Sequence, residues 1–125
     1  MTLCGFSLGA LTIYTCLLKL SEDPEAILGA ILNVVIFGVP VAIAPIETWG
    51  KMRMLVAGRF IHCYSKNDWV LQYLHRSTTL TLGDIAGLNP IPGVDGIENV
   101  DMTAHIGGHL EYAEKIPEMI KMFNL

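Results

Sequence analysis

The residues Gly5-Phe6-Ser7-Leu8-Gly9 match the pattern Gly-x-Ser-x-Gly, which carries a reactive serine on a tight strand-to-helix turn. A short strand-like run precedes the turn at residues 2–4, and an apolar helix-like run follows it at residues 8–20. The first N–H groups of such a helix face negative charge that develops at the serine. The pattern and its flanks therefore predict that Ser7 is a nucleophile.

Small residues two positions before and two positions after the serine leave room for this turn, and here they are Gly5 and Gly9. The backbone N–H of Leu8 is the donor that the motif itself contributes to an oxyanion hole. Nothing in the sequence indicates which group supplies the second donor.

A serine hydroxyl is a weak nucleophile at neutral pH, so it needs a base, and the base needs an orienting acid. Ser7, Asp68 and His109 follow the order serine, acid, histidine that accompanies this motif. Each of them follows an expected strand, and the carboxyl ends of parallel strands meet at one rim. We expect the three side chains to converge, with His109 between the other two. Asp68 also suits the N-cap of the helix that it precedes.

The four histidines differ in their suitability as the base. His109 follows two glycines, which favour placement of an imidazole over the rim, and His105 in the same loop is the alternative base. His62 lies within an expected strand and is interpreted as a core residue. His75 lies late on an expected helix, where it can complement the helix dipole.

The elements that must position these residues alternate along the chain, which is typical of a parallel α/β sheet. Glycine and proline mark residues 83–96 as a loop, and Ser21 or Asp23 is a candidate cap for a short helix after Pro24. The expected strands cover residues 2–4, 33–37, 59–64 and 97–102, and the expected helices cover 8–20, 46–56, 68–76 and 109–123.

The position of the motif indicates which part of a fold is present. In an α/β-hydrolase several strands precede the Gly-x-Ser-x-Gly motif, whereas here only residues 1–4 do. We therefore interpret residues 1–125 as one partial domain, the C-terminal half of an α/β-hydrolase fold, from the serine turn to the last helix. An unpaired edge at strand 2–4 leads us to expect that the isolated chain self-associates and hydrolyses model esters poorly.

The composition excludes some classes of function. The net charge is -4 and no Lys/Arg cluster occurs, so we expect no binding to nucleic acid. Charged residues make up 16% and apolar residues 52% of the chain, as suits parallel strands covered on both faces. Cys4, Cys16 and Cys63 lack metal-binding spacing and are interpreted as free, buried thiols in a reducing intracellular compartment. No pattern indicates a metal ion or a cofactor.

Residues 26–46 contain no charge and approach the length of a membrane span. A soluble alternative explains this stretch better, because the β-branched and aromatic residues 33–37 indicate a buried strand that ends at Gly38 and Pro40.

Several spaced motifs together resemble the transmembrane and coiled-coil domain-containing family. They are residues 5–10 (GFSLGA), 38–40 (GVP), 65–69 (SKNDW), 98–101 (ENVD) and 108–112 (GHLEY). The resemblance covers nearly the whole chain. It implies an α/β-hydrolase-like domain, places Ser7, Asp68 and His109 at the triad-like positions of the family, and implies a membrane-associated parent protein.

Two classes of function fit these observations. The first is a serine hydrolase of the esterase or lipase type, acting on a small-molecule ester or a lipid. The second is a catalytically silent α/β-hydrolase-like module for interactions in membrane trafficking, and an inactive truncated fragment is a further alternative.

Overall fold

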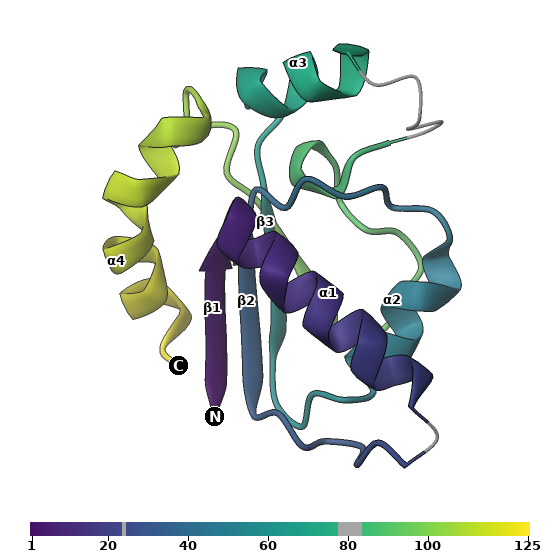
Figure 1. Cartoon of the computed structure of the whole chain (residues 1–125). Helices are drawn as coiled ribbons and strands as arrows, with labels where there is room; N and C mark the ends of the chain where they lie inside the picture. Colours follow the sequence, from purple (N-terminus) through teal and green to yellow (C-terminus); the bar gives the residue numbers. More distant parts are fainter. Residues whose placement is uncertain (24, 78–83) are drawn as a thin grey trace.

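The computed structural model describes residues 1–23, 25–77 and 84–125 (Figure 1). Its four strands form one sheet in chain order, and every neighbouring pair is parallel. The strands are β1 (Thr2–Phe6), β2 (Asn33–Phe37), β3 (Phe60–Tyr64) and β4 (Ile97–Asp101), and the helices are α1 (Leu8–Glu22), α2 (Ile46–Arg53), α3 (Trp69–Ser77) and α4 (Tyr112–Phe123), with short 3₁₀ turns η1 (Ala86–Leu88) and η2 (His109–Glu111). The predicted α/β fold with a parallel sheet is confirmed.

The two faces of the sheet have separate cores, and β2 contributes to both because successive side chains alternate. Val34 and Ile36 pack with α1 and α2 around the buried Trp49, whose indole N–H donates to the Ile43 carbonyl at 2.9 Å. On the opposite face, Val35 and Phe37 pack with residues of α4. The sheet thus lies between α1 and α2 on one side and α4 on the other.

The register of the strands brings their carboxyl ends level. Phe6 pairs with Phe37, Phe37 with Cys63, and Cys63 with Val100, so the chain leaves the strands at one rim. The helix α3 lies beyond this rim (Figure 1). Residues that follow β1, β3 and β4 are therefore close in space although they are distant in sequence.

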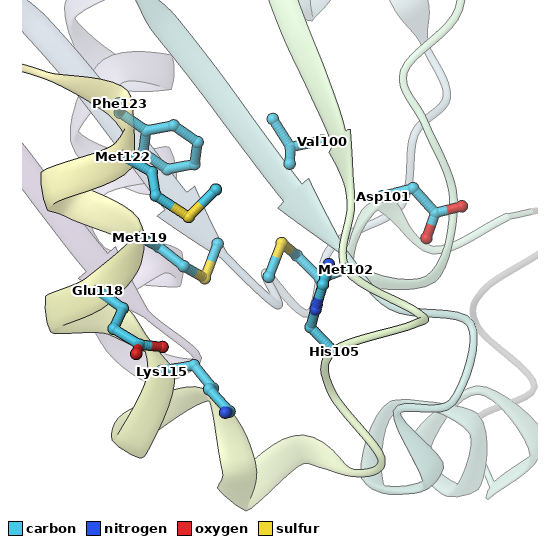
Figure 2. Close-up of a pocket in the computed structure, with 9 residues that line it drawn as sticks. All are labelled: Val100, Asp101, Met102, His105, Lys115, Glu118, Met119, Met122 and Phe123. Carbon is cyan, nitrogen blue, oxygen red and sulfur yellow. The ribbon is translucent and has the colours of Figure 1, made fainter.

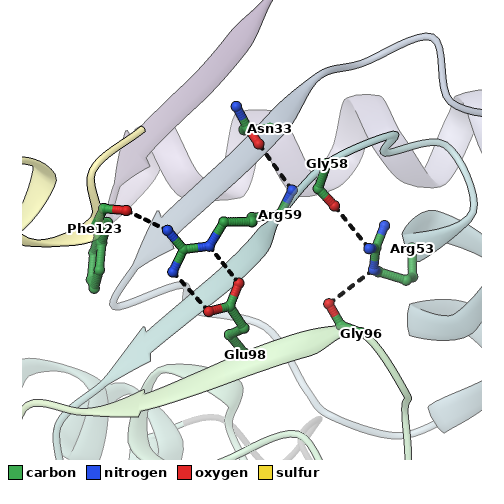
Figure 3. Close-up of polar contacts among 7 residues, drawn as sticks. All are labelled: Asn33, Arg53, Gly58, Arg59, Gly96, Glu98 and Phe123. Atoms are coloured by element: carbon green, nitrogen blue, oxygen red, sulfur yellow. Dashed lines mark hydrogen bonds and ion pairs between the residues drawn. The ribbon is translucent and has the colours of Figure 1, made fainter.

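At the opposite end of the sheet, Arg59 links β3 to β4 and to the end of α4 (Figure 3). Its guanidinium forms an ion pair with Glu98 at 2.8 Å and donates to the backbone carbonyl of Phe123. Arg53 donates to the carbonyls of Gly96 and Gly58 at 2.9 and 2.8 Å. The contact of Arg59 holds the C-terminal end of α4 to the sheet, whereas Arg53 ties α2 to the segments before β3 and β4, and His109 lies just before the N-terminal end of α4.

Some expectations about the elements were wrong in detail. Turns occupy residues 25–30 instead of a short helix, and the Asp23 carboxylate accepts the Glu25 N–H at 2.9 Å. The second helix stops at Arg53, because Val56 leaves the helix to bridge to Ile31. Residues 26–46 contain β2, and no helix in the described ranges has the length and apolar character to cross a bilayer.

Of the three thiols, which are all free, Cys63 is buried as expected but Cys4 and Cys16 are exposed. Cys4 lies on β1, whose second edge has no partner strand within the part of the chain that the structure describes. Cys16 lies on α1, where only Ala10 and Leu17 are fully buried. The helix that follows the serine turn is therefore less buried than its apolar sequence predicts.

Candidate active site

Ser7 lies between β1 and α1 with backbone angles φ 53° and ψ -111°. A positive φ is strained for a residue with a side chain, by about 1–3 kcal/mol. Two hydrogen bonds hold it: the Ser7 N–H donates to the Phe37 carbonyl at 3.0 Å, and the Ser7 carbonyl accepts the Leu11 N–H at 2.9 Å. The sheet and the helix together impose the strained turn.

The hydroxyl of Ser7 bonds across the fold. A serine at the N-cap of a helix commonly bonds an N–H of that helix, but Ser7 makes no such cap. Its Oγ lies 2.8 Å from Nε2 of His109, a residue 102 positions away. The N–H of Leu8 opens α1, so it belongs to the first turn, whose N–H groups have no partner within the helix.

Asp68 uses its two carboxylate oxygens for different purposes. Oδ1 accepts the Leu71 N–H at 3.1 Å, which caps α3, and Oδ2 lies 2.5 Å from Nδ1 of His109. The side chain is fully buried. The two interpretations of Asp68, helix cap and partner of the histidine, therefore describe one residue that does both.

His109 lies at the start of the 3₁₀ turn η2 and is only 6% exposed. Because a carboxylate accepts at Nδ1, that nitrogen carries the proton, and Nε2 is free to accept the Ser7 hydroxyl proton. Two aromatic rings pack against the imidazole: Phe6 at a centroid distance of 4.9 Å and Tyr112 at 6.2 Å. The side chains of Ser7, His109 and Asp68 form one hydrogen-bonded row.

Three features of the site were not identified from the sequence. Gly38 has φ +58°, and a Cβ there would lie 3.4 Å from His109 and 3.5 Å from Asp68. Tyr112 is fully buried, and burial together with the charge of Asp68 raises the pKa of its phenol. Phe6, the third, occupies the variable position before the serine. Gly38 appeared only as the end of a strand, because its closeness to the site depends on the register between β2 and β3.

The two glycines of the serine turn differ in their surroundings. A Cβ at Gly5 would lie 2.7 Å from the backbone of Gly9 and from Ile13, whereas a Cβ at Gly9 would contact nothing within 4 Å. The described structure therefore demands a glycine at position 5 but leaves open space at position 9.

We expect Gly5→Ala to lower the free energy of unfolding by about 2 kcal/mol, because the added methyl overpacks against backbone atoms. Gly9→Ala, the matched control, is expected to raise it by about 0.5–1 kcal/mol, because alanine favours the helix. Urea denaturation measures both changes. Equal losses in the two variants would contradict the steric difference.

The other histidines lie outside this row. His105 is exposed and lines an apolar cavity of about 180 Å³ between β4 and α4, with Met102 and Met119 (Figure 2). His62 is fully buried in the sheet, and its Nδ1 lies 2.9 Å from Oδ1 of Asn99. The backbone of His75 belongs to α3, and its side chain lies outside the described part of the structure.

In the described ranges, no three His, Cys, Asp or Glu side chains are placed to share a metal ion. The arrangement that remains is a buried acid, a histidine and a strained serine at the start of a helix.

A family model described as "Protein of unknown function (DUF726)" matches residues 1–125. The chain belongs to the DUF726 family. The resemblance to transmembrane and coiled-coil domain-containing proteins is confirmed, since this DUF726 chain is 42% identical over 127 residues to the rice "Transmembrane and coiled-coil domain-containing protein STS1".

Two further relatives are fungal. Over 125 residues the DUF726 chain is 38% identical to "Probable lipase MIL1" of Saccharomyces cerevisiae, and over 120 residues it is 45% identical to "Uncharacterized membrane protein C6F6.13c" of Schizosaccharomyces pombe. The matches cover 100%, 100% and 96% of this chain for the rice, budding-yeast and fission-yeast proteins, but only 18%, 11% and 15% of those relatives. No solved structure matches the chain.

Proposed function

We propose that this DUF726 domain is a serine hydrolase that cleaves esters through Ser7, His109 and Asp68. The observation that carries the proposal is the hydrogen-bonded row in which His109 bonds Ser7 through Nε2 and Asp68 through Nδ1. A relative named as a probable lipase supports an ester or lipid substrate. Relatives named as membrane proteins support a membrane-associated parent protein.

The mechanism follows from the geometry. His109 Nε2 accepts the Ser7 proton while Oγ attacks the ester carbonyl, and the Leu8 N–H at the start of α1 stabilises the oxyanion. The imidazolium then protonates the leaving alcohol, and Asp68 stabilises its charge throughout. A water molecule, deprotonated by His109, hydrolyses the acyl-enzyme and restores Ser7.

We further propose that residues 1–125 are the C-terminal part of a larger α/β-hydrolase domain. The free edge of β1 supports this, because a parallel strand elsewhere in the protein would satisfy its backbone groups. That part of the protein would also supply the second oxyanion donor. The same free edge is the reason to expect self-association of the isolated chain.

A fluorophosphonate probe tests the proposed function, because it reacts with serine only where the hydroxyl is activated. We expect the full-length protein to be labelled at Ser7, as mapped by mass spectrometry, and Ser7→Ala to abolish the label. Ser21→Ala is a matched control, because the Ser21 hydroxyl only caps the Leu18 carbonyl of its own helix. A folded protein that stays unlabelled would instead favour the non-catalytic interaction module.

A further inference from the structure

Each residue of the hydrogen-bonded row is followed directly in the sequence by a large apolar side chain that is exposed. Leu8 is 73% exposed, Trp69 61% and Leu110 73%. Tyr73, at 69%, lies four residues after Trp69 and therefore on the same side of α3. We call Leu8, Trp69, Tyr73 and Leu110 the apolar rim.

Three members of the apolar rim adjoin the hydrogen-bonded row in the chain. Consecutive Cα atoms are about 3.8 Å apart, so three of its members are direct neighbours of Ser7, Asp68 and His109. The indole of Trp69 also approaches the segment that carries His109, because a Cβ at Gly108 would lie 3.0 Å from Trp69 Nε1. A long acyl chain whose carbonyl carbon bonds to Ser7 Oγ can reach residues at this spacing.

The direct sequence neighbours of the row carry no formal charge, and the nearby Glu111 carboxylate is engaged by the Gly107 N–H at 2.7 Å. The residues that precede its members are Phe6, Asn67 and Gly108, and those that follow are the three apolar ones of the rim. A charged group next to the scissile bond would therefore lose hydration without gaining an ionic partner among these direct neighbours. An apolar group would instead gain by covering exposed Leu and Trp side chains.

We propose that the apolar rim binds the acyl chain of the substrate, so that the site favours uncharged esters of long, apolar acids. This inference rests on the proposed function. The acyl carbon bonds to Ser7 Oγ as its bond to the alcohol oxygen breaks, and the alcohol leaves with the proton from His109. The chain then stays on the rim until water releases the acid.

A second group of exposed apolar residues lies at the other end of the sheet and includes Ile27, Leu28 and Met54. Among the described residues, Ser21 and Lys51 lie beside this group, but the Ser21 hydroxyl bonds the Leu18 carbonyl and not a histidine, so nothing there indicates what covers it. The position of the rim around Ser7 is what distinguishes it and identifies the acyl chain as its occupant.

The test compares kcat/KM for p-nitrophenyl acetate and p-nitrophenyl octanoate in the full-length protein. We expect the octanoate to be favoured at least about tenfold, a small part of what full burial of its extra methylenes would give. The double variant Trp69→Ser/Leu110→Ser is expected to lower kcat/KM for the octanoate about tenfold more than kcat/KM for the acetate, which removes the preference. Met122→Ser, which alters an exposed residue of α4 (80% exposed), is expected to leave the preference unchanged.

The outcomes separate the inference from the proposed function. Acetate turnover without any preference for octanoate in the unaltered protein would overturn the rim as an acyl site and leave the hydrolase standing. Equal losses of kcat/KM on both esters in the double variant would also overturn the rim as an acyl site. Loss of cooperative unfolding in the double variant would overturn it as well, because it would mean that another part of the protein covers the apolar rim. Turnover of neither ester by the unaltered protein would contradict the hydrolase itself, and the rim with it.

Discussion

Replacing Asp68 by asparagine is expected to lower kcat for p-nitrophenyl acetate by about 10⁴-fold. The carboxamide can donate to Nδ1 of His109, which places the imidazole proton on Nε2. A protonated Nε2 faces Ser7 and can no longer accept the serine proton. Stability should change little, because asparagine is as good an N-cap for α3 as aspartate. Steady-state kinetics and thermal unfolding of the same preparation measure the two effects.

Asp101→Asn is the matched control for this substitution. The exposed Asp101 carboxylate accepts the Thr103 N–H at 2.9 Å, a bond that an asparagine oxygen can keep. We expect no change in kcat. A loss of less than tenfold in Asp68→Asn, or an equal loss in both variants, would remove Asp68 from the mechanism.

The second large effect concerns stability at low pH and arises from His62. Burial lowers the pKa of its imidazole from 6.5 to about 4, against a weaker opposing effect of the bond to Asn99. Asn99 accepts the Ile91 N–H at Oδ1 and donates to the Ile91 carbonyl through Nδ2. Oδ1 therefore also accepts the proton on Nδ1 of His62, and Nε2 is buried without a hydrogen bond to the residues that the structure describes, with the Ala86 backbone as the nearby group that favours its protonation.

Because the pKa is lower in the folded state, protonation favours the unfolded chain. The stabilising contribution is complete above about pH 6.5 and is lost as the pH falls towards 4, by about 3 kcal/mol in total. We expect urea denaturation at pH 7 and at pH 4 to show this loss in the free energy of unfolding. His62→Leu is expected to reduce the difference between the two unfolding free energies by the same amount. His105→Gln, which replaces an exposed imidazole, should retain the wild-type dependence. An unchanged dependence in His62→Leu would assign the loss to other groups.

Much of the fold follows from local patterns. Alternation of short strand-like runs with apolar or amphipathic helix-like runs predicts the four strands and four helices, and the motif around Ser7 predicts the strand-to-helix turn. The same patterns place Ser7, Asp68 and His109 after different strands, and the structure places their side chains in one row; their catalytic roles stay predictions. The C-terminal end of α2 depends on the bridge between Val56 and Ile31, which no local pattern encodes. The bond from the Glu25 N–H to Asp23 is local, but a cap and a turn are alternative uses of the same aspartate.

The remaining features depend on strand register. Gly38 lies near His109 only because the carboxyl ends of β2 and β3 are aligned. The rings of Phe6 and Tyr112, which are far apart in the sequence, both pack against the imidazole. The open space beside Gly9 is likewise a property of the assembled fold. A sequence motif names such positions as small or variable, but only tertiary packing explains which of them the site requires.

The long separation between Ser7 and His109 has a consequence for when this site comes into existence. Their hydrogen bond joins residues 102 positions apart, and the bond between Asp68 and His109 joins residues 41 positions apart. Contacts of this range form late, because loop-closure entropy must be overcome before they contribute any stability. Ser7 is made 102 residues before His109, so a growing chain carries Ser7 without its histidine partner until the segment with His109 and α4 has emerged and docked.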